Sequence, residues 1–290
     1  MKEKAEGKSL TNRYHATKYK YVTRLKGVRM MILKGLLGVL VCFTYLMVSV
    51  ASWAAHPMIT DDTGTQGEGK FQLEVNGQYD SDKETIDGVS VKTTGKELGT
   101  TLSYGIFENV DLVLSLPYQW EKIEEDDVTI YNESGISDMV FEVKWRFFEK
   151  DGLSLALKPG ISIPTGDDER GLGTGKVGYQ AFLIVSKEIA ALAFHANLGY
   201  IRNENKVDEE KNIWHASLAT TWEVVKNLKL VANVGIERNP DDSADNDPAF
   251  LIAGVIYSVT ENLDLDCGIK YGLNSSETDP SLMAGVAYRF

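Results

Sequence analysis

From about residue 71 onward, apolar and polar residues alternate with a period of two. In the stretch 71–79, for example, Gln72, Glu74, Asn76 and Gln78 separate apolar or small residues. Successive side chains of a β-strand point to opposite faces, so this pattern predicts strands with one apolar and one polar face. Twelve such segments follow one another, at 71–79, 97–104, 110–118, 139–147, 153–163, 177–185, 192–200, 214–222, 228–236, 249–259, 263–271 and 282–290. The chain is therefore expected to be all-β.

The connections between these segments alternate in length. Short turns are expected at 107–109, 149–152, 187–190, 225–227 and 260–262. Longer polar loops are expected at 80–94, 121–136, 164–175, 202–211, 238–247 and 273–280. Bacterial transmembrane barrels have short turns at one end and long extracellular loops at the other. We therefore predict a transmembrane antiparallel up-and-down β-barrel of about 12 strands.

A soluble β-sandwich or barrel would also alternate, and the aromatic residues distinguish the two interpretations. When the strands are laid alternately up and down, one group of aromatic residues collects at the loop ends and another at the turn ends. The first group is Tyr79, Tyr118, Trp120, Tyr200 and Tyr271, and the second is Tyr104, Trp145, Phe147, Trp222, Tyr257 and Tyr288. Two aromatic belts that flank an aliphatic band are typical of membrane–water interfaces. The pattern favours the bacterial outer membrane.

The N-terminal part of the chain has the pattern of an export signal. Several basic residues precede an apolar run at 35–50, and Ser52-Trp53-Ala54 follow it. This order predicts a signal peptide over 1–54, cleaved after Ala54 or Ala55, with Met30 or Met31 as candidate true starts. An uncleaved anchor is the alternative, although the run is short for a span of ~20 residues. We expect 55–69 to be a periplasmic N-terminal segment and 70–290 to be the barrel.

Charge is distributed unevenly along the sequence. The first 54 residues hold 10 of the 30 Lys and Arg residues and 2 of the 42 Asp and Glu residues. The remainder therefore holds 20 basic and 40 acidic residues, a net charge of about −20. Such a charge argues against nucleic acid or anionic lipid headgroups as partners of the chain as a whole.

Because side chains alternate between the two faces of a strand, fourteen charged residues are expected on the inward face. They are Glu74, Glu97, Asp111, Glu142, Lys144, Arg146, Lys158, Glu223, Lys229, Glu237, Asp264, Asp266, Lys270 and Arg289. They either pair across the lumen or line a path for a solute. Our candidates for lining the pore are Lys144, Arg146, Lys158, His195, Asn197, Lys229, Asp264, Asp266 and Lys270. A barrel of twelve strands lies between the filled eight-stranded barrels and the wide porins, so a narrow or partly plugged passage is expected.

Other chemistry-like patterns are weak. Gly173–Gly178 fits G-x-G-x-x-G, but a strand rather than a helix is expected after it, so we predict no nucleotide or other cofactor. Asp241, Asp242, Asp245 and Asp247 offer oxygens for a weak Ca²⁺ contact, which could bridge to lipopolysaccharide, yet they lack the glycine and glutamate of an EF-hand loop. We predict no catalytic residues and no dedicated metal site. A lipid hydrolase with a lipid-facing Ser/His pair remains an alternative, although parity turns His195 and His215 inward.

Several short motifs follow one another through the first half of the predicted mature chain. They are 56–64 (HPMITDDTG), 69–74 (GKFQLE), 113–118 (VLSLPY), 135–138 (GISD) and 158–166 (KPGISIPTG). With these motifs the chain resembles the outer-membrane "meta-pathway of phenol degradation" family of transporters. The resemblance implies a barrel for the uptake of small, often aromatic, compounds, and it implies no catalytic residue.

The sequence thus predicts an outer-membrane channel that lets small solutes, including aromatic or other hydrophobic compounds, pass passively. A structural or surface-interaction barrel with a closed lumen is a further alternative. The expected partners are the solute, outer-membrane lipid and lipopolysaccharide. The chain ends at Phe290 after an alternating strand, which resembles the signal read by the barrel assembly machinery.

Overall fold

The computed structural model describes residues 56–86, 89–241, 244, 246–278 and 280–290. The predicted signal peptide and its cleavage site lie outside these residues. The strands are β1 (Phe71–Ile86), β2 (Val89–Phe107), β3 (Val110–Glu125), β4 (Val128–Ile136), β5 (Met139–Lys150), β6 (Leu153–Ile163), β7 (Gly178–Ile189), β8 (Leu192–Arg202), β9 (Asn212–Val225), β10 (Leu228–Glu237), β11 (Ala249–Ser258), β12 (Leu263–Gly272) and β13 (Ser281–Arg289). A single 3₁₀ turn, η1 (Asp168–Arg170), is the one helical element in the described part of the chain.

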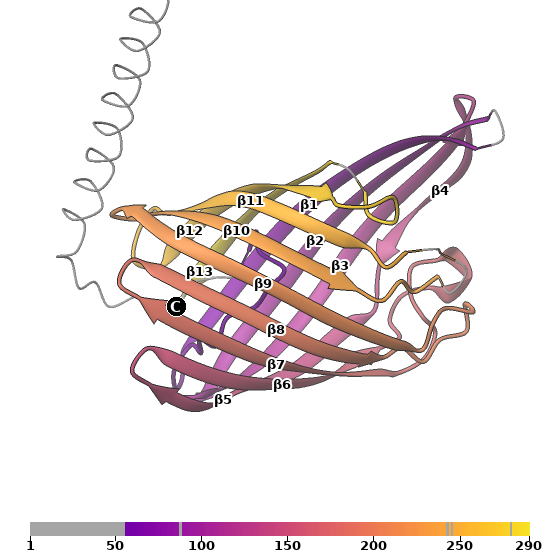
Figure 1. Cartoon of the computed structure of the whole chain (residues 1–290). Coiled ribbons are helices and arrows are strands. Elements are labelled where there is room, and N and C mark those ends of the chain that lie inside the picture. Colours follow the sequence, from indigo (N-terminus) through magenta and orange to yellow (C-terminus); the bar gives the residue numbers. More distant parts are fainter. Residues whose placement is uncertain (1–55, 87–88, 242–243, 245, 279) are drawn as a thin grey trace, which may run out of the picture. The chain divides into compact units, whose positions relative to one another are not determined.

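The strands form one closed antiparallel barrel (Figure 1). Apart from β4 and β5, which do not pair with each other, strands that are neighbours in sequence pair in the sheet. The first strand, β1, closes the barrel against β13, from Gln72 opposite Arg289 to Asp80 opposite Ser281. One wall position is shared, because β3 pairs with β5 near one end and with β4 near the other. Counting β4 and β5 as one interrupted strand gives the predicted twelve-stranded barrel.

The barrel wall is apolar outside and polar inside. Leu198 and Leu218 are 62% and 60% exposed, whereas Asp111 and Asp264 are each 1% exposed. A soluble barrel would bury its leucines, but a barrel in lipid exposes them to acyl chains and turns its polar face to the lumen. Among the described residues, no helix is long and apolar enough to span a membrane.

Two of the predicted loops, 80–94 and 121–136, are instead mostly paired strand, which corrects the prediction. Beyond Asp80 and Ser115, where pairing with β13 and β5 ends, β1, β2, β3 and β4 continue as a small four-stranded sheet (Figure 1). We call residues 80–95 and 121–136 the flap. Outside the membrane neither face of a sheet needs to be apolar, so the alternation that marks the other strands is absent here.

Candidate functional site

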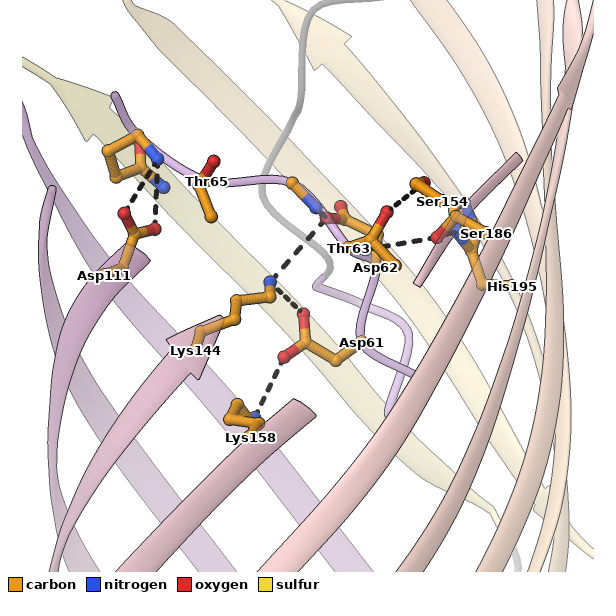
Figure 2. Close-up of polar contacts among 12 residues, drawn as sticks. Asp61, Asp62, Thr63, Thr65, Asp111, Lys144, Ser154, Lys158, Ser186 and His195 are labelled. Carbon is orange, nitrogen blue, oxygen red and sulfur yellow. Dashed lines mark hydrogen bonds and ion pairs between the residues drawn. The ribbon is translucent and has the colours of Figure 1, made fainter. Parts of the chain in front are cut away.

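The residues that precede β1 enter the interior of the barrel. The described part of the predicted periplasmic segment, His56 to Gly69, forms hydrogen bonds and ion pairs with inward-facing side chains of strands around the wall (Figure 2). We call these residues the inner segment. Because the barrel wall surrounds it, the inner segment determines how much of the lumen stays open.

Asp61 is the centre of these contacts. Its carboxylate accepts hydrogen bonds from Lys144 Nζ of β5 and Lys158 Nζ of β6, each at 2.9 Å (Figure 2). The side-chain amide of Asn197 on β8 pairs with the Asp61 backbone, donating to its carbonyl at 2.9 Å and accepting from its N–H at 2.7 Å. Three strands therefore hold one residue of the inner segment.

The electrostatics of this cluster favour an ionised Asp61. Burial disfavours the charged carboxylate, but the ammonium groups of Lys144 and Lys158 outweigh burial and hold the pKa of Asp61 well below its usual range. Lys144 Nζ also lies 3.7 Å from Asp62, and Lys158 Nζ lies 3.4 Å from Glu142. The two lysines are thus neutralised by carboxylates, as buried charges require.

Uncharged polar groups hold the inner segment on either side of Asp61. Asn233 of β10 accepts from the backbone N–H groups of Ile59 and Thr60, at 2.7 and 3.1 Å, and donates to Thr60 Oγ1 at 2.6 Å. Ser186 Oγ of β7 accepts from the Thr63 N–H at 3.1 Å (Figure 2). These bonds satisfy backbone groups that would otherwise be buried without a partner.

The start of the inner segment packs closely against β11 and β12. A Cβ at Gly254 would lie 2.7 Å from Pro57 Cγ, and one at Gly268 would lie 3.0 Å from Pro57. Both positions therefore need glycine for the close approach. Met58 follows and packs in an apolar patch with Ala219, Val231 and Ile256 of β9, β10 and β11.

The end of the inner segment crosses to the opposite wall. The N–H of Gln66 donates to the carboxylate of Asp111 on β3 at 3.0 Å. Gly69 then donates to the carbonyl of Gly105 at 2.8 Å, and Gly105 donates to that of Lys70 at 2.9 Å, which leads the chain into β1. The inner segment is consequently fixed at both ends and in its middle.

Two cavities lie inside the barrel along β1, β2 and β3. One cavity of about 220 Å³ borders the inner segment and is lined by Gln72, Glu74, Asn76, Thr101, Ser103 and Lys144, among others. A second cavity of about 290 Å³ is lined by Gln78, Glu97, Gly99 and Leu116, among others. Both are also lined by His56, Asn76, Thr101 and Ser115, so the two spaces adjoin.

The structure brings together only some of the predicted pore-lining residues. Lys144, Lys158 and Asn197 meet at Asp61, and Asp266 contacts His56. The others bond elsewhere on the inner wall or at its ends: His195 to Ser186, Arg146 to Glu149, Asp264 to Arg289 and Lys270 to Glu277, while Lys229 is buried. Only Lys144 and Lys158 of the nine candidates line either cavity.

Sequence reasoning missed the residues that face the remaining space. Glu74 and Glu97 were expected to face inward but were not singled out, and Asp61 was placed outside the barrel. Asp61 does lie in the 56–64 motif, which was the one available signal for it.

A strand, β7, follows the glycine-rich loop, as predicted. Asp247 pairs with Arg238 at 3.2 Å, and Asp242 and Asp245 lie outside the described residues. Among the residues that the structure describes, no three or more potential metal ligands form a group.

Histidines and serines do meet, but inside the barrel. His195 Nδ1 lies 2.8 Å from Ser186 Oγ, and His215 lies 2.9 Å from both Ser217 and Glu237. His195, His215 and Ser217 are each at most 8% exposed, and the Ser186 side chain is buried as well. These pairs are on the lumen side, so they do not provide the lipid-facing site that the hydrolase alternative requires.

Solved structures share this architecture. The "COG4313 outer membrane channel" from Pseudomonas putida F1 superimposes with a TM-score of 0.61 at 14% identity, covering 79% of this chain and 98% of that one. The NanC porin gives 0.48 at 13% identity over 74% and 98%, and the "CymD monoaromatic hydrocarbon channel" gives 0.43 at 9% identity over 77% and 88%. No curated protein sequence matches.

The lipid-facing apolar band and the closed wall make this protein an outer-membrane β-barrel. The family described as "Putative MetA-pathway of phenol degradation" matches residues 57–290, which include almost all of the inner segment and the whole barrel. The chain therefore belongs to the "Putative MetA-pathway of phenol degradation" family.

Proposed function

We propose that this protein is a passive outer-membrane channel whose solutes pass between the inner segment and the wall formed by β1, β2 and β3. The observation that carries the proposal is the pair of adjoining cavities on this side of the lumen. Hydrogen bonds to Lys144, Ser186 and Asn233 attach the inner segment to β5, β7 and β10. Passive passage needs an open path and no energy source.

The size and lining of the cavities indicate the class of solute. A cavity of roughly 150 Å³ is enough to bind benzene in an engineered protein, so spaces of about 220 and 290 Å³ admit a single ring. Gln72, Asn76 and Thr101 add hydrogen-bonding groups to the lining. Together with the family's link to phenol degradation, this favours small aromatic compounds that carry a hydroxyl or similar polar group.

The test blocks the path where the two cavities meet. Thr101 lines both cavities, and its hydroxyl lies 3.0 Å from that of Ser115. Thr101→Trp should fill this point and lower the entry of phenol into proteoliposomes several-fold. Thr100→Trp is the matched control, because the neighbouring side chain points to lipid. Equal phenol entry through the two variants and the wild type would refute this path.

A structural barrel is the second candidate, because the inner segment occupies much of the lumen. Deleting residues 56–69 distinguishes the two. If the wild-type barrel is silent in planar bilayers and only the deletion variant conducts, the inner segment closes the lumen and the structural role stands. Measurable wild-type conductance that increases on deletion supports the channel.

We further propose that the protein has no enzymatic activity and that it has two partners besides its solute. Lipopolysaccharide would contact the extracellular side, and the barrel assembly machinery would recognise the strand that ends at Phe290. An outer-membrane barrel contacts the assembly machinery during insertion and lipopolysaccharide afterwards.

A further inference from the structure

The flap has two chemically different faces. In an antiparallel pair, directly opposed residues share a face, so the register fixes which side chains lie together. The lipid-facing row Gly77–Leu98–Tyr118 is followed by Tyr79–Lys96–Trp120, then Ser81–Thr94–Lys122, then Lys83–Lys92–Glu124. The register of these residues has no shift between the rows, so the outward surface of the barrel continues onto the flap.

Four lysines and one glutamate are the charged residues of these outward rows. Lys83, Lys92 and Lys96 are exposed, and the side chain of Lys122 is 40% exposed. Lys122 pairs with Glu124 at 2.6 Å. None of the carboxylates whose side chains the structure describes lies within ion-pair distance of the other three lysines. We call Lys83, Lys92, Lys96 and Lys122 the lysine face.

The opposite face of the same sheet is acidic. Asp80 and Asp82 of β1 alternate with the outward residues, as do Glu97 of β2 and Glu121 of β3. Apart from Glu124, positive and negative side chains are thus sorted onto the two faces. Residues 55–290 carry a net charge of about −20, so a surface with four lysines and one glutamate is not what random placement of charges would give.

Other outward basic residues at the loop ends are already neutralised. Arg202 of β8 lies 2.6 Å from Glu204, and Arg238 lies 3.2 Å from Asp247. The lysine face differs because, among the side chains that the structure describes, no carboxylate lies within ion-pair distance of Lys83, Lys92 or Lys96.

The position of the lysine face relative to the membrane indicates what it meets. Tyr79 and Trp120 belong to the aromatic belt, and Lys96 lies between them with Nζ 6.0 Å from the Tyr79 ring centre. Aromatic belts lie at the level of the lipid headgroups. Successive rows are about 7 Å apart along the strands, so Lys122, Lys83 and Lys92 follow directly above the belt, among the headgroups.

We propose that the lysine face binds the phosphate groups of outer-leaflet glycolipid molecules adjacent to the barrel. Ammonium groups are compact charges with three donors each, which suits phosphate oxygens presented from several directions. This contact is direct and needs no bridging divalent ion. It does not depend on the channel function, and it would anchor the flap side of the barrel to the outer leaflet.

The experiment compares two variants of equal charge. Purified full-length protein in a nonionic detergent is titrated with lipid A bisphosphate or with its dephosphorylated form, and bound lipid is counted by native mass spectrometry. The test variant is K83Q/K92Q/K96Q. The control is K176Q/K206Q/K211Q, which removes three loop lysines from the other side of the mouth. Heat-modifiable migration on gels shows that each barrel is folded.

We expect the wild type and the control to prefer the phosphorylated lipid. The test variant should bind it at least tenfold more weakly, because each lysine near an anionic surface contributes roughly fivefold to binding. The dephosphorylated lipid should bind all three proteins alike. Unchanged binding by the test variant, or equal loss in both variants, would overturn the proposal. So would loss of a protein dimer with unchanged lipid binding, because the lysine face would then join two copies.

Discussion

Phe71 and Phe290 exchange both of their backbone hydrogen bonds across the seam of the barrel. Phe71 N–H donates to the Phe290 carbonyl at 2.8 Å, and Phe290 N–H donates to the Phe71 carbonyl at 3.0 Å. Their rings stack with centroids 5.5 Å apart, and Phe71 stacks in turn on Tyr104. The last residue of the chain is therefore paired with the first residue of β1.

Deleting Phe290 should impair assembly. The deletion removes two closing hydrogen bonds and the aromatic stack, and it removes the terminal residue that we expect the assembly machinery to recognise. At normal synthesis levels, unassembled protein should accumulate in the periplasm, as fractionation and the loss of heat-modifiable migration would reveal. Phe290→Tyr keeps the ring and the backbone bonds, so it should assemble normally. Wild-type amounts of the deletion variant in the outer membrane would contradict the prediction.

The strands could be predicted because their outer face must be apolar in lipid. Segments such as 192–200 and 228–236 coincide with β8 and β10 to within two residues. The flap could not be predicted in this way, since strands beyond the membrane pair through their backbones and need no apolar face. Its polar sequence has the composition of a loop.

The candidate site was only half predictable, for a related reason. Parity correctly turned Lys144, Lys158 and Asn197 inward, because they lie on strands with a strong alternation. Their partner Asp61 lies 83 residues before Lys144 in a segment without any periodic pattern. A tertiary hydrogen bond across such a distance leaves no local signal in the sequence.

Asp61→Asn should loosen the inner segment. The substitution leaves Lys144 and Lys158 without most of their neutralising charge, and breaking a buried ion pair costs about 3 kcal/mol. Part of that cost is avoided if the inner segment leaves the wall, so single-channel recordings should show larger and noisier conductance than the wild type. Asp62→Asn is the control, because Asp62 lies farther from Lys144, at 3.7 Å. Identical traces for D61N and the wild type would show that Asp61 does not hold the inner segment.

The mature protein should begin near residue 55. The basic stretch, the apolar run and the small residues at 52–54 occur in the order of a cleaved export signal. Mass spectrometry of protein extracted from membranes should find an N-terminus at Ala55 or His56. Recovery of the intact chain would instead support the uncleaved anchor.

The barrel should prefer cations, and the preference should depend on salt. Asp80, Asp82, Glu97 and Glu121 lie on the inward face of the flap or at its base, and Glu97 also lines a cavity. Carboxylates around a mouth raise the local concentration of cations. Because these groups contact water, their effect is screened as the Debye length falls from about 10 Å at 0.1 M salt to about 3 Å at 1 M. Reversal potentials under a salt gradient should therefore show cation preference at low ionic strength and little cation preference at high ionic strength.

The D80N/D82N/E121Q variant tests the origin of this preference. At low salt it should prefer cations less than the wild type does, and at high salt its reversal potential should differ little from that of the wild type. Firm anion selectivity would show instead that Lys144 and Lys158, which border the adjoining cavity, govern the path.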